Sequence, residues 1–424
     1  MQTEAPPATP PQRDGDAIDV SVHAAGTGAS LAHRLWTYRH PSLVPVLFLW
    51  LVIALGIDDY GRIWSPTVPG LLTSNDWLIN YEGGFVRRGL SGELLYLFHR
   101  AFTSSTLTQD LLVLQMGLYV AVGVVVTILA LRTRNRLLPW VLLSPAAVLF
   151  TSYNALGGFR EELLFFVALG LIALAAHTRS ARRVAALCSA GAALYVVFLL
   201  SWEAGILLLP VVVLCLREAL RPLPPAWFRR LATTLAAASA VAFIVQAIHP
   251  GNAAVVARIC SSLARAGIPY RVNCTPTGKG IDGLASLGQS WHYTVHEVLA
   301  NWPGYGFFFV WFALALAPFL VSGWARRHGT FTLVAIACVV PLFVIGSDYG
   351  RWIHLSIMSL TFFWFMTAEP EPRADAPKGA LEVLALSAWV TCWSLNYWKD
   401  PFMVGGLWNA LDLSGLLRHF HQYL

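Results

Sequence analysis

Carboxylates and guanidinium groups lie close together in one polar stretch of the sequence, SNDWLINYEGGFVRRGL. Asp76 and Glu82 precede a Gly-Gly pair, and the adjacent arginines Arg87 and Arg88 follow it. A carboxylate can remove a proton from a hydroxyl group, and guanidinium groups bind phosphate oxygens in a fixed geometry. The stretch therefore predicts a site for an anionic, lipid-borne substrate, with Asp76 as the favoured general base. The alternative is that Arg87 and Arg88 only extend toward lipid phosphates.

Two further carboxylate positions are candidates for catalysis. Glu203 stands between two apolar runs in LLSWEAGILLLP, where an unpaired carboxylate is costly and a functional role is the default interpretation. Its alternative role is an ion pair with an arginine. Asp58 and Asp59 directly follow another apolar run, and Asp59 is a second candidate for the general base. The alternative for this pair is a hydrated helix end.

Charged residues also gather in two short turns, GGFREELLFF and GSDYGRW. One of the two consecutive glutamates can stabilise the start of the following helix, while the other faces the helix bundle. In the second turn, the aspartate and the arginine can pair with each other, which would be a structural role. The candidate substrate-binding residues are Glu82, Arg87, Arg88, Arg160, Glu161, Glu162, Asp348 and Arg351.

No metal or organic cofactor is predicted. His292 and His296 would share one face of a helix, but neither an HExxH pattern nor a third convincing ligand accompanies them. No Walker loop, Rossmann glycine pattern or GxSxG elbow occurs. Of the six cysteines, Cys260 and Cys274 fall in one polar loop, where they either form a disulfide or stay free.

A membrane-embedded scaffold must position these polar residues. Of 424 residues, 56% are hydrophobic and 12% are charged, against roughly 25% charged in a soluble domain. Apolar stretches of about 15 to 20 residues recur along the chain, as a bilayer demands of helices. The sequence therefore predicts an all-α, polytopic transmembrane helix bundle of about ten or eleven spans. The predicted spans are residues 41–57, 110–131, 137–152, 162–176, 184–200, 204–216, 231–248, 304–321, 330–345, 352–366 and 380–395.

Arginine clusters distinguish the two sides of this bundle. They lie in short connections such as 132–136 and 326–327, which the positive-inside rule assigns to the cytoplasm. The protein is then a multi-pass inner-membrane protein of a bacterium with a cytoplasmic N-terminus, in which 1–40 form a disordered tail and 41–424 one membrane domain. Because the net charge of +6 comes from separate clusters, no nucleic-acid partner is expected. The outer side receives two long loops, at about 58–109 and 249–303, and an interfacial helix at about 90–98.

The predicted outer residues suit the transfer of a sugar from a lipid phosphate or diphosphate. A carboxylate would deprotonate the acceptor hydroxyl, and arginines would stabilise the charge on the departing phosphate. Nucleotide sugars are cytoplasmic, so an outer site implies a polyprenyl-linked donor. The sequence therefore predicts a membrane glycosyltransferase or a polysaccharide polymerase.

The layout of the chain resembles the polytopic GT-C-type glycosyltransferases. The resemblance rests on the long first outer loop with its acidic residues, the Arg/Glu turn of GGFREE, and the WEAGILLLP pattern. The same features are similar to the polymerases that join lipid-linked repeat units in exopolysaccharide and O-antigen assembly. Two departures are the Asp58-Asp59 pair, where many such transferases have Asp-Glu, and the distance of DWLINYEGGFVRRGL from the first span.

Two other classes of protein are alternatives. A transporter or flippase of lipid-linked oligosaccharide would usually carry polar groups at the bilayer midplane, whereas these spans are nearly free of charge in their middles. A scaffold subunit of a secretion complex would explain the spans but not the outer carboxylates. The expected partners are a polyprenyl-phosphate- or diphosphate-linked glycan, membrane lipids and other polysaccharide-assembly membrane proteins.

Overall fold

The fold was analysed in a computed structural model that describes residues 45–54, 76–102, 105–153, 160–267, 284, 287–371 and 379–395. Within these ranges the chain is helical and contains no strand, which confirms the predicted all-α helix bundle. All the described residues belong to one compact unit, Pro41–Leu424. The predicted tail at 1–40 and the pair Asp58 and Asp59 lie outside the described residues.

Four helices of the described chain are long and apolar enough to cross a membrane. They contain 20 to 26 residues, and at about 1.5 Å per residue they match a hydrocarbon core about 30 Å thick. Each coincides with one predicted span. These helices are α3 (Leu107–Arg132), α8 (Ala181–Ser201), α10 (Pro225–Ala247) and α14 (Trp302–Val321).

Most other predicted spans correspond to shorter helices. The predicted span 162–176 matches α7 residue for residue, although α7 has only 15 residues. The span at 204–216 begins with a 3-10 turn and continues as an α-helix. These elements are helix Pro45–Ala54, α7 (Glu162–Ala176), η1 (Glu203–Leu208), α9 (Leu209–Ala219), α18 (Tyr349–Thr367) and α19 (Ala380–Thr391).

Two predicted spans are broken, and a proline accounts for each break. The span at 137–152 consists of α4 (Leu138–Leu142) and α5 (Leu149–Tyr153), with Pro145 between them. The span at 330–345 consists of α16 (Gly329–Ala337) and α17 (Val340–Ile345), and Pro341 lies in the first turn of α17. Proline lacks a backbone N–H and disfavours helical geometry in the residue before it, so a helix is interrupted there.

The two predicted outer loops contain helices of their own. The first carries α2 (Gly89–Phe102), which extends the predicted interfacial helix and exposes Leu94, Leu97 and Phe98 while it buries Leu95. The second contains two helices and is therefore more ordered than the predicted polar loop. They are α11 (Ala253–Arg265) and α13 (Leu287–Ala300). Outside these loops, the short helix α15 (Trp324–Arg327) carries Arg326 and Arg327.

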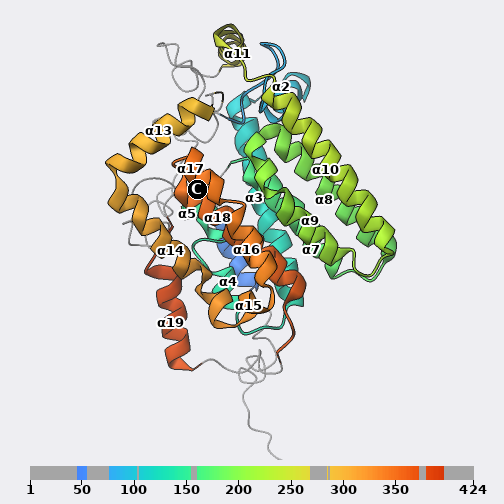
Figure 1. Cartoon of the computed structure of the whole chain (residues 1–424), viewed down its shortest axis with the longest axis vertical. Helices are drawn as coiled ribbons and strands as arrows, with labels where there is room; N and C mark the ends of the chain where they lie inside the picture. Colours follow the sequence, from blue (N-terminus) through green and yellow to red (C-terminus); the bar gives the residue numbers. More distant parts are fainter. Residues whose placement is uncertain are drawn as a thin grey trace, which may run out of the picture. The chain divides into compact units, whose positions relative to one another are not determined.

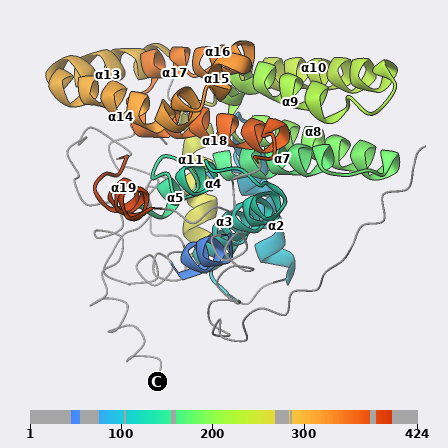
Figure 2. The ribbon, with the colours of Figure 1, turned by 90° about the horizontal axis from the view of Figure 1, so that it is seen from below.

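Two helices organise the packing. α7 contacts α3, α8, α9 and α18, and Figure 1 shows α7, α8, α9 and α10 running alongside one another. In Figure 2, α18 lies among α7, α14 and α16, all of which it contacts. α7 and α8 approach closely because Gly191 has no side chain: a Cβ there would lie 2.8 Å from the Ala168 carbonyl oxygen. α7 and α18 contact each other, and both contact α9.

Candidate functional site

Eight charged side chains from four segments form two sets of ion pairs that interact electrostatically, and we call the eight together the polar cluster. The segments are the stretch 76–88, the start of α7, the start of η1 and the first turn of α18. All eight were predicted as site residues, although they are far apart in the sequence. The members are Asp76, Arg87, Arg88, Arg160, Glu161, Glu162, Glu203 and Arg351.

Glu203 is bound by the arginine pair. The Arg88 guanidinium donates from Nε to Glu203 Oε2 at 2.6 Å and from Nη2 to Oε1 at 2.9 Å, and Arg87 Nη1 lies 3.6 Å from Oε1. Burial alone would raise the pKa of Glu203, but Arg88 and Arg87 hold it below its usual value. Glu203 thus stays ionised with both oxygens engaged, so the geometry favours the predicted ion-pair role over the predicted catalytic one.

Asp76 is held by two other guanidinium groups. Arg160 Nη1 donates to Asp76 Oδ2 at 3.3 Å, and Arg88 Nη1 lies 3.6 Å from the same oxygen. Burial raises the pKa of Asp76, but the charges of Arg88 and Arg160 outweigh it and keep the pKa below the usual value. An aspartate with a lowered pKa accepts protons weakly at neutral pH, which makes Asp76 a poorer base than the sequence predicted.

Arg351 connects α18 to the start of α7. Its guanidinium donates to both oxygens of Glu162, at 3.0 and 2.7 Å, and to Glu161 Oε2 at 3.3 Å. The predicted local partner, Asp348, lies farther away at 3.8 Å and is more exposed. The indole rings of Trp202 and Trp352 stack on each other, and the guanidinium lies 4.9 Å and 5.3 Å from their centroids.

Glu161 differs from the other carboxylates of the polar cluster. It is fully buried at the start of α7, and its Oε1 has no hydrogen-bond partner among the described residues. Burial, followed by repulsion from Asp76, raises its pKa to about 7 although Arg351 and Arg160 oppose the shift. A carboxylate with this pKa can both accept and release a proton near neutral pH.

Arg88 is fixed through its backbone as well as its side chain. Its φ of 61° lies in the left-handed region, which is rare for a residue other than glycine and is often found at functional sites. The Arg88 N–H donates to Gln246 Oε1 at 3.1 Å, and Gln246 Nε2 donates to the Leu199 carbonyl oxygen at 2.7 Å. The Arg87 N–H likewise donates to the His249 carbonyl oxygen at 2.9 Å. The end of α10 therefore positions both arginines.

Sequence reasoning missed Gln246 and Trp202. A lone glutamine within the apolar run AFIVQAI was a usable signal, because a polar residue inside a membrane span is a functional candidate. Trp202 precedes Glu203 directly, but its contact with Arg351 depends on packing between distant segments. The residues next to Trp202 in the sequence therefore gave no indication that it belongs to the site.

Glu82 lies apart from the polar cluster. Its carboxylate is 3.7 Å from Arg100 and 4.0 Å from Arg265, and neither arginine belongs to the cluster. The side chain of Glu82 is about a quarter exposed, whereas the cluster side chains are at most 15% exposed. Arg258 on α11 donates twice to the Gly83 carbonyl oxygen, at 3.1 and 2.7 Å. Glu82 therefore lies at the junction with α2 and α11, outside the polar cluster.

The polar cluster contains no cysteine and no histidine. Within the described ranges, no three His, Cys, Asp or Glu side chains form a group that could hold a metal ion. Cys260 is in a disulfide, while the remaining described cysteines are free. Cys274, the residue with which Cys260 was considered as a pair, lies outside the described residues. The free cysteines are Cys188, Cys215, Cys338 and Cys392.

The long apolar helices and the family comparison define the class of protein. The chain is a multi-pass α-helical membrane protein. It belongs to the family described as uncharacterised membrane protein Rv1490, whose model matches residues 67–282, just over half of the chain. The matched region contains every member of the polar cluster except Arg351. Because the family description states no activity, the resemblance to glycosyltransferases remains a prediction.

The other two comparisons found no relatives. No curated protein and no solved structure matches the chain. The function is therefore argued from the site itself.

Proposed function

We propose that the protein is a membrane glycosyltransferase or polysaccharide polymerase that uses a polyprenyl-linked sugar donor at the periplasmic face of a bacterial inner membrane. It would act in exopolysaccharide or cell-envelope glycan assembly. The single observation that carries the proposal is Glu161, a buried carboxylate with a raised pKa that is paired with Arg351 and lies in the field of Arg160. Such a site can remove a proton and receive a phosphate at the same time.

The charge balance of the polar cluster supports an anionic substrate. Four guanidinium groups face four carboxylates, and one of these carboxylates, Glu161, has a pKa of about 7. Glu161 acts as a base in its ionised form, in which the cluster is neutral, and once Glu161 has taken up the acceptor proton the cluster carries a net positive charge. In a buried site this excess attracts an anion strongly, because the local dielectric is low.

In the proposed reaction, Glu161 Oε1 accepts the proton of the acceptor hydroxyl. The hydroxyl oxygen forms a bond to the anomeric carbon of the donor sugar, and the bond from that carbon to the phosphate oxygen breaks. The bonding electron pair leaves with the lipid phosphate, whose added charge is stabilised by the guanidinium groups. The roles of Glu203 and Asp76 are to hold Arg88 and Arg160 in place.

The arginines at the opposite helix ends support this orientation. α3 ends at Arg132, and Arg179 follows α7, so by the positive-inside rule these ends are cytoplasmic. Glu161 lies at the other end of α7, which the proposal assigns to the periplasm. The N-terminus is cytoplasmic in this arrangement.

The test is a transfer assay with purified protein in vesicles, using polyprenyl-diphosphate-linked sugars as donors. Glu161→Gln should reduce the rate by about 10²- to 10⁴-fold, as expected for a lost general base. The matched control is Glu82→Gln, because this glutamate lies in the neighbouring stretch but outside the polar cluster. A Glu161→Gln variant as active as wild type would reject the proposal.

In cells, deletion of the gene should abolish a surface polymer and accumulate short lipid-linked glycans. Wild type should restore the polymer, whereas Glu161→Gln should be made in normal amount and fail. Unchanged glycans in the deletion strain would contradict the proposed function.

A transporter or flippase is the second candidate, and His354 favours it. This residue is fully buried one turn deeper than Arg351, and its Nε2 has no hydrogen-bond partner among the described residues. A polar group at that depth suits a translocation path. The two functions separate in vesicles: a flippase moves the labelled lipid-linked glycan to the other leaflet unchanged, whereas a transferase joins two glycans.

A further inference from the structure

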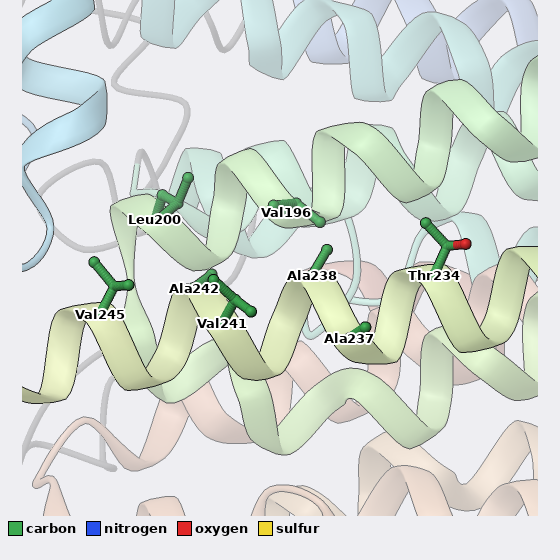
Figure 3. A pocket seen from close by; sticks show the side chains of 8 residues that line it. All are labelled: Val196, Leu200, Thr234, Ala237, Ala238, Val241, Ala242 and Val245. Carbon is green, nitrogen blue, oxygen red and sulfur yellow. The ribbon is translucent and has the colours of Figure 1, made fainter.

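An apolar groove runs between two membrane-spanning helices, α8 and α10. Its volume is about 580 Å³, and Figure 3 shows its lining side chains along the two helices. Val241 is 60% exposed, so the groove is open along its side. On α10 it extends from Thr234 to Val245, a distance of about 16 Å at 1.5 Å per residue. The lining residues are Val196, Leu200, Thr234, Ala237, Ala238, Val241, Ala242 and Val245.

One end of the groove adjoins the polar cluster. Val245 directly precedes Gln246, whose Oε1 accepts the Arg88 N–H at 3.1 Å. On α8, Leu200 is three residues from Glu203, which the Arg88 guanidinium binds through both oxygens. One end of the groove therefore lies next to the residues that hold Arg88, and the other end lies in the apolar part of both helices.

We infer that this groove binds the isoprenoid chain of a polyprenyl phosphate, with the phosphate at Arg87 and Arg88. The inference rests on the proposed function, since the donor there is a polyprenyl-linked glycan. Polarity fixes the orientation: the phosphate lies at the polar end, where the guanidinium groups of Arg87 and Arg88 are held by Glu203, and the apolar chain follows the aliphatic lining.

The shape of the groove favours a single-chain lipid. The slot lies between only two helices, and small residues such as Ala238 and Ala242 leave room for one chain between them. In a polyprenyl phosphate, one chain is joined directly to the phosphate. In phosphatidic acid, a glycerol unit separates the phosphate from two chains, and only one of these could enter the slot.

The experiment measures binding to the full-length protein in nanodiscs. The two probes are a long-chain polyprenyl monophosphate and dimethylallyl monophosphate, which has the same head and a single isoprene unit. Wild type should bind the long probe more tightly by on the order of tenfold to hundredfold, since the groove buries additional apolar carbon. Ala238→Phe fills the groove and should remove this preference while leaving the binding of the short probe unchanged.

The matched control is Ala240→Phe, an exposed position on the same helix outside the groove. It should keep the wild-type preference. Partition of the long probe into the nanodisc is equal for both variants, so the comparison between them isolates the groove. A long-chain preference that survives in Ala238→Phe would overturn the inference.

A phosphatidic acid probe distinguishes the other occupant. If Ala238→Phe weakens phosphatidic acid binding as much as polyprenyl phosphate binding, the groove is a general lipid site and the isoprenoid assignment is wrong. The binding assay requires no sugar transfer. Groove-dependent binding in a protein without transfer activity would therefore refute the proposed function and support lipid binding in the groove. Transfer activity without groove-dependent binding would refute lipid binding in the groove alone.

Discussion

Two groups of arginine and acidic residues differ in burial rather than in composition. In the polar cluster, the Arg351 and Glu162 side chains are 3% and 0% exposed. In the other group, which we call the peripheral cluster, Arg327 and Glu369 are 56% and 76% exposed although their ion pair is only 3.0 Å long. The peripheral cluster comprises Arg134, Asn135, Arg136, Arg327, Glu369, Glu371 and Glu382.

We interpret this difference as one between a candidate functional site, which is buried, and exposed charges that set the topology of the helices in the membrane. Exposed ion pairs are screened by water and contribute about 0 to 1 kcal/mol, so they fix the orientation of helices with little cost or gain. Buried charges must each be matched, since an unpaired one costs several kcal/mol. A cluster retained under that constraint is a candidate for chemistry, whereas short distances between charges alone are not.

The largest effect is expected from Arg351→Ala. It leaves Glu161 and Glu162 buried without their guanidinium partner, so the free energy of unfolding should fall by about 3 to 5 kcal/mol. Chemical denaturation in detergent micelles measures this value. A loss as small as that of an exposed pair would show that burial does not distinguish the two clusters.

The next effect is expected from Gln246→Leu, which removes the acceptor of the Arg88 N–H and the donor to the Leu199 carbonyl oxygen. Leaving these groups unsatisfied should lower the free energy of unfolding by about 1 to 3 kcal/mol. Asn135→Leu is the counterpart in the peripheral cluster, where water replaces the lost hydrogen bonds. Equal losses in the two variants would contradict the comparison.

The polar cluster should also contribute a pH dependence through Glu161. The pKa of Glu161 is raised from 4.5 to about 7 on folding, so between these pH values the folded state binds more protons than the unfolded state. Glu161 should therefore contribute stability that is lost as the pH rises through this window, which is the part of the slope that depends on Glu161. Denaturation at several pH values tests this, and Glu161→Gln should remove that part of the slope. Asp76 and Glu203 have lowered pKa values, so their contribution to stability is lost only at lower pH, as the pH falls and they become protonated.

The smallest effect is expected from Arg327→Ala in the peripheral cluster. Because its partner Glu369 is exposed, the free energy of unfolding should change by less than about 1 kcal/mol, and added salt should reduce the change further. Denaturation at low and high salt measures both. A large loss of unfolding free energy that salt does not reduce would mean that the Arg327–Glu369 pair stabilises the fold more than its exposure indicates.

The sequence predicted the helices better than their continuity. Long apolar runs without proline, such as those of α3 and α8, were located to within a few residues because hydropathy alone determines them. The run at 137–152 has similar hydropathy, but Pro145 interrupts the backbone hydrogen bonds. The helices α11 and α13 were missed inside a loop that was treated as polar and irregular.

The members of the site were predicted, but most of their partners were not. Charged residues at the ends of apolar runs, such as Glu161 and Arg351, can be recognised as candidate site residues from the sequence. The pairing of Arg351 with Glu162 joins residues 189 positions apart, so it depends on how α18 packs against α7. The local alternative, Asp348, was the only partner that sequence spacing could suggest.

The long-range pairing of Arg351 also sets the order in which the site can be assembled during synthesis. The two carboxylates at the start of α7 enter the membrane when the chain carrying Arg351 has not yet been made. Until α18 packs, they need hydration, which the aqueous interface can provide at the end of a helix but not in its middle. Contacts of such high sequence separation form slowly. Maturation of the site therefore waits for the C-terminal third of the chain, and a nascent protein without α18 would insert most of its long helices while lacking the arginine that completes the cluster.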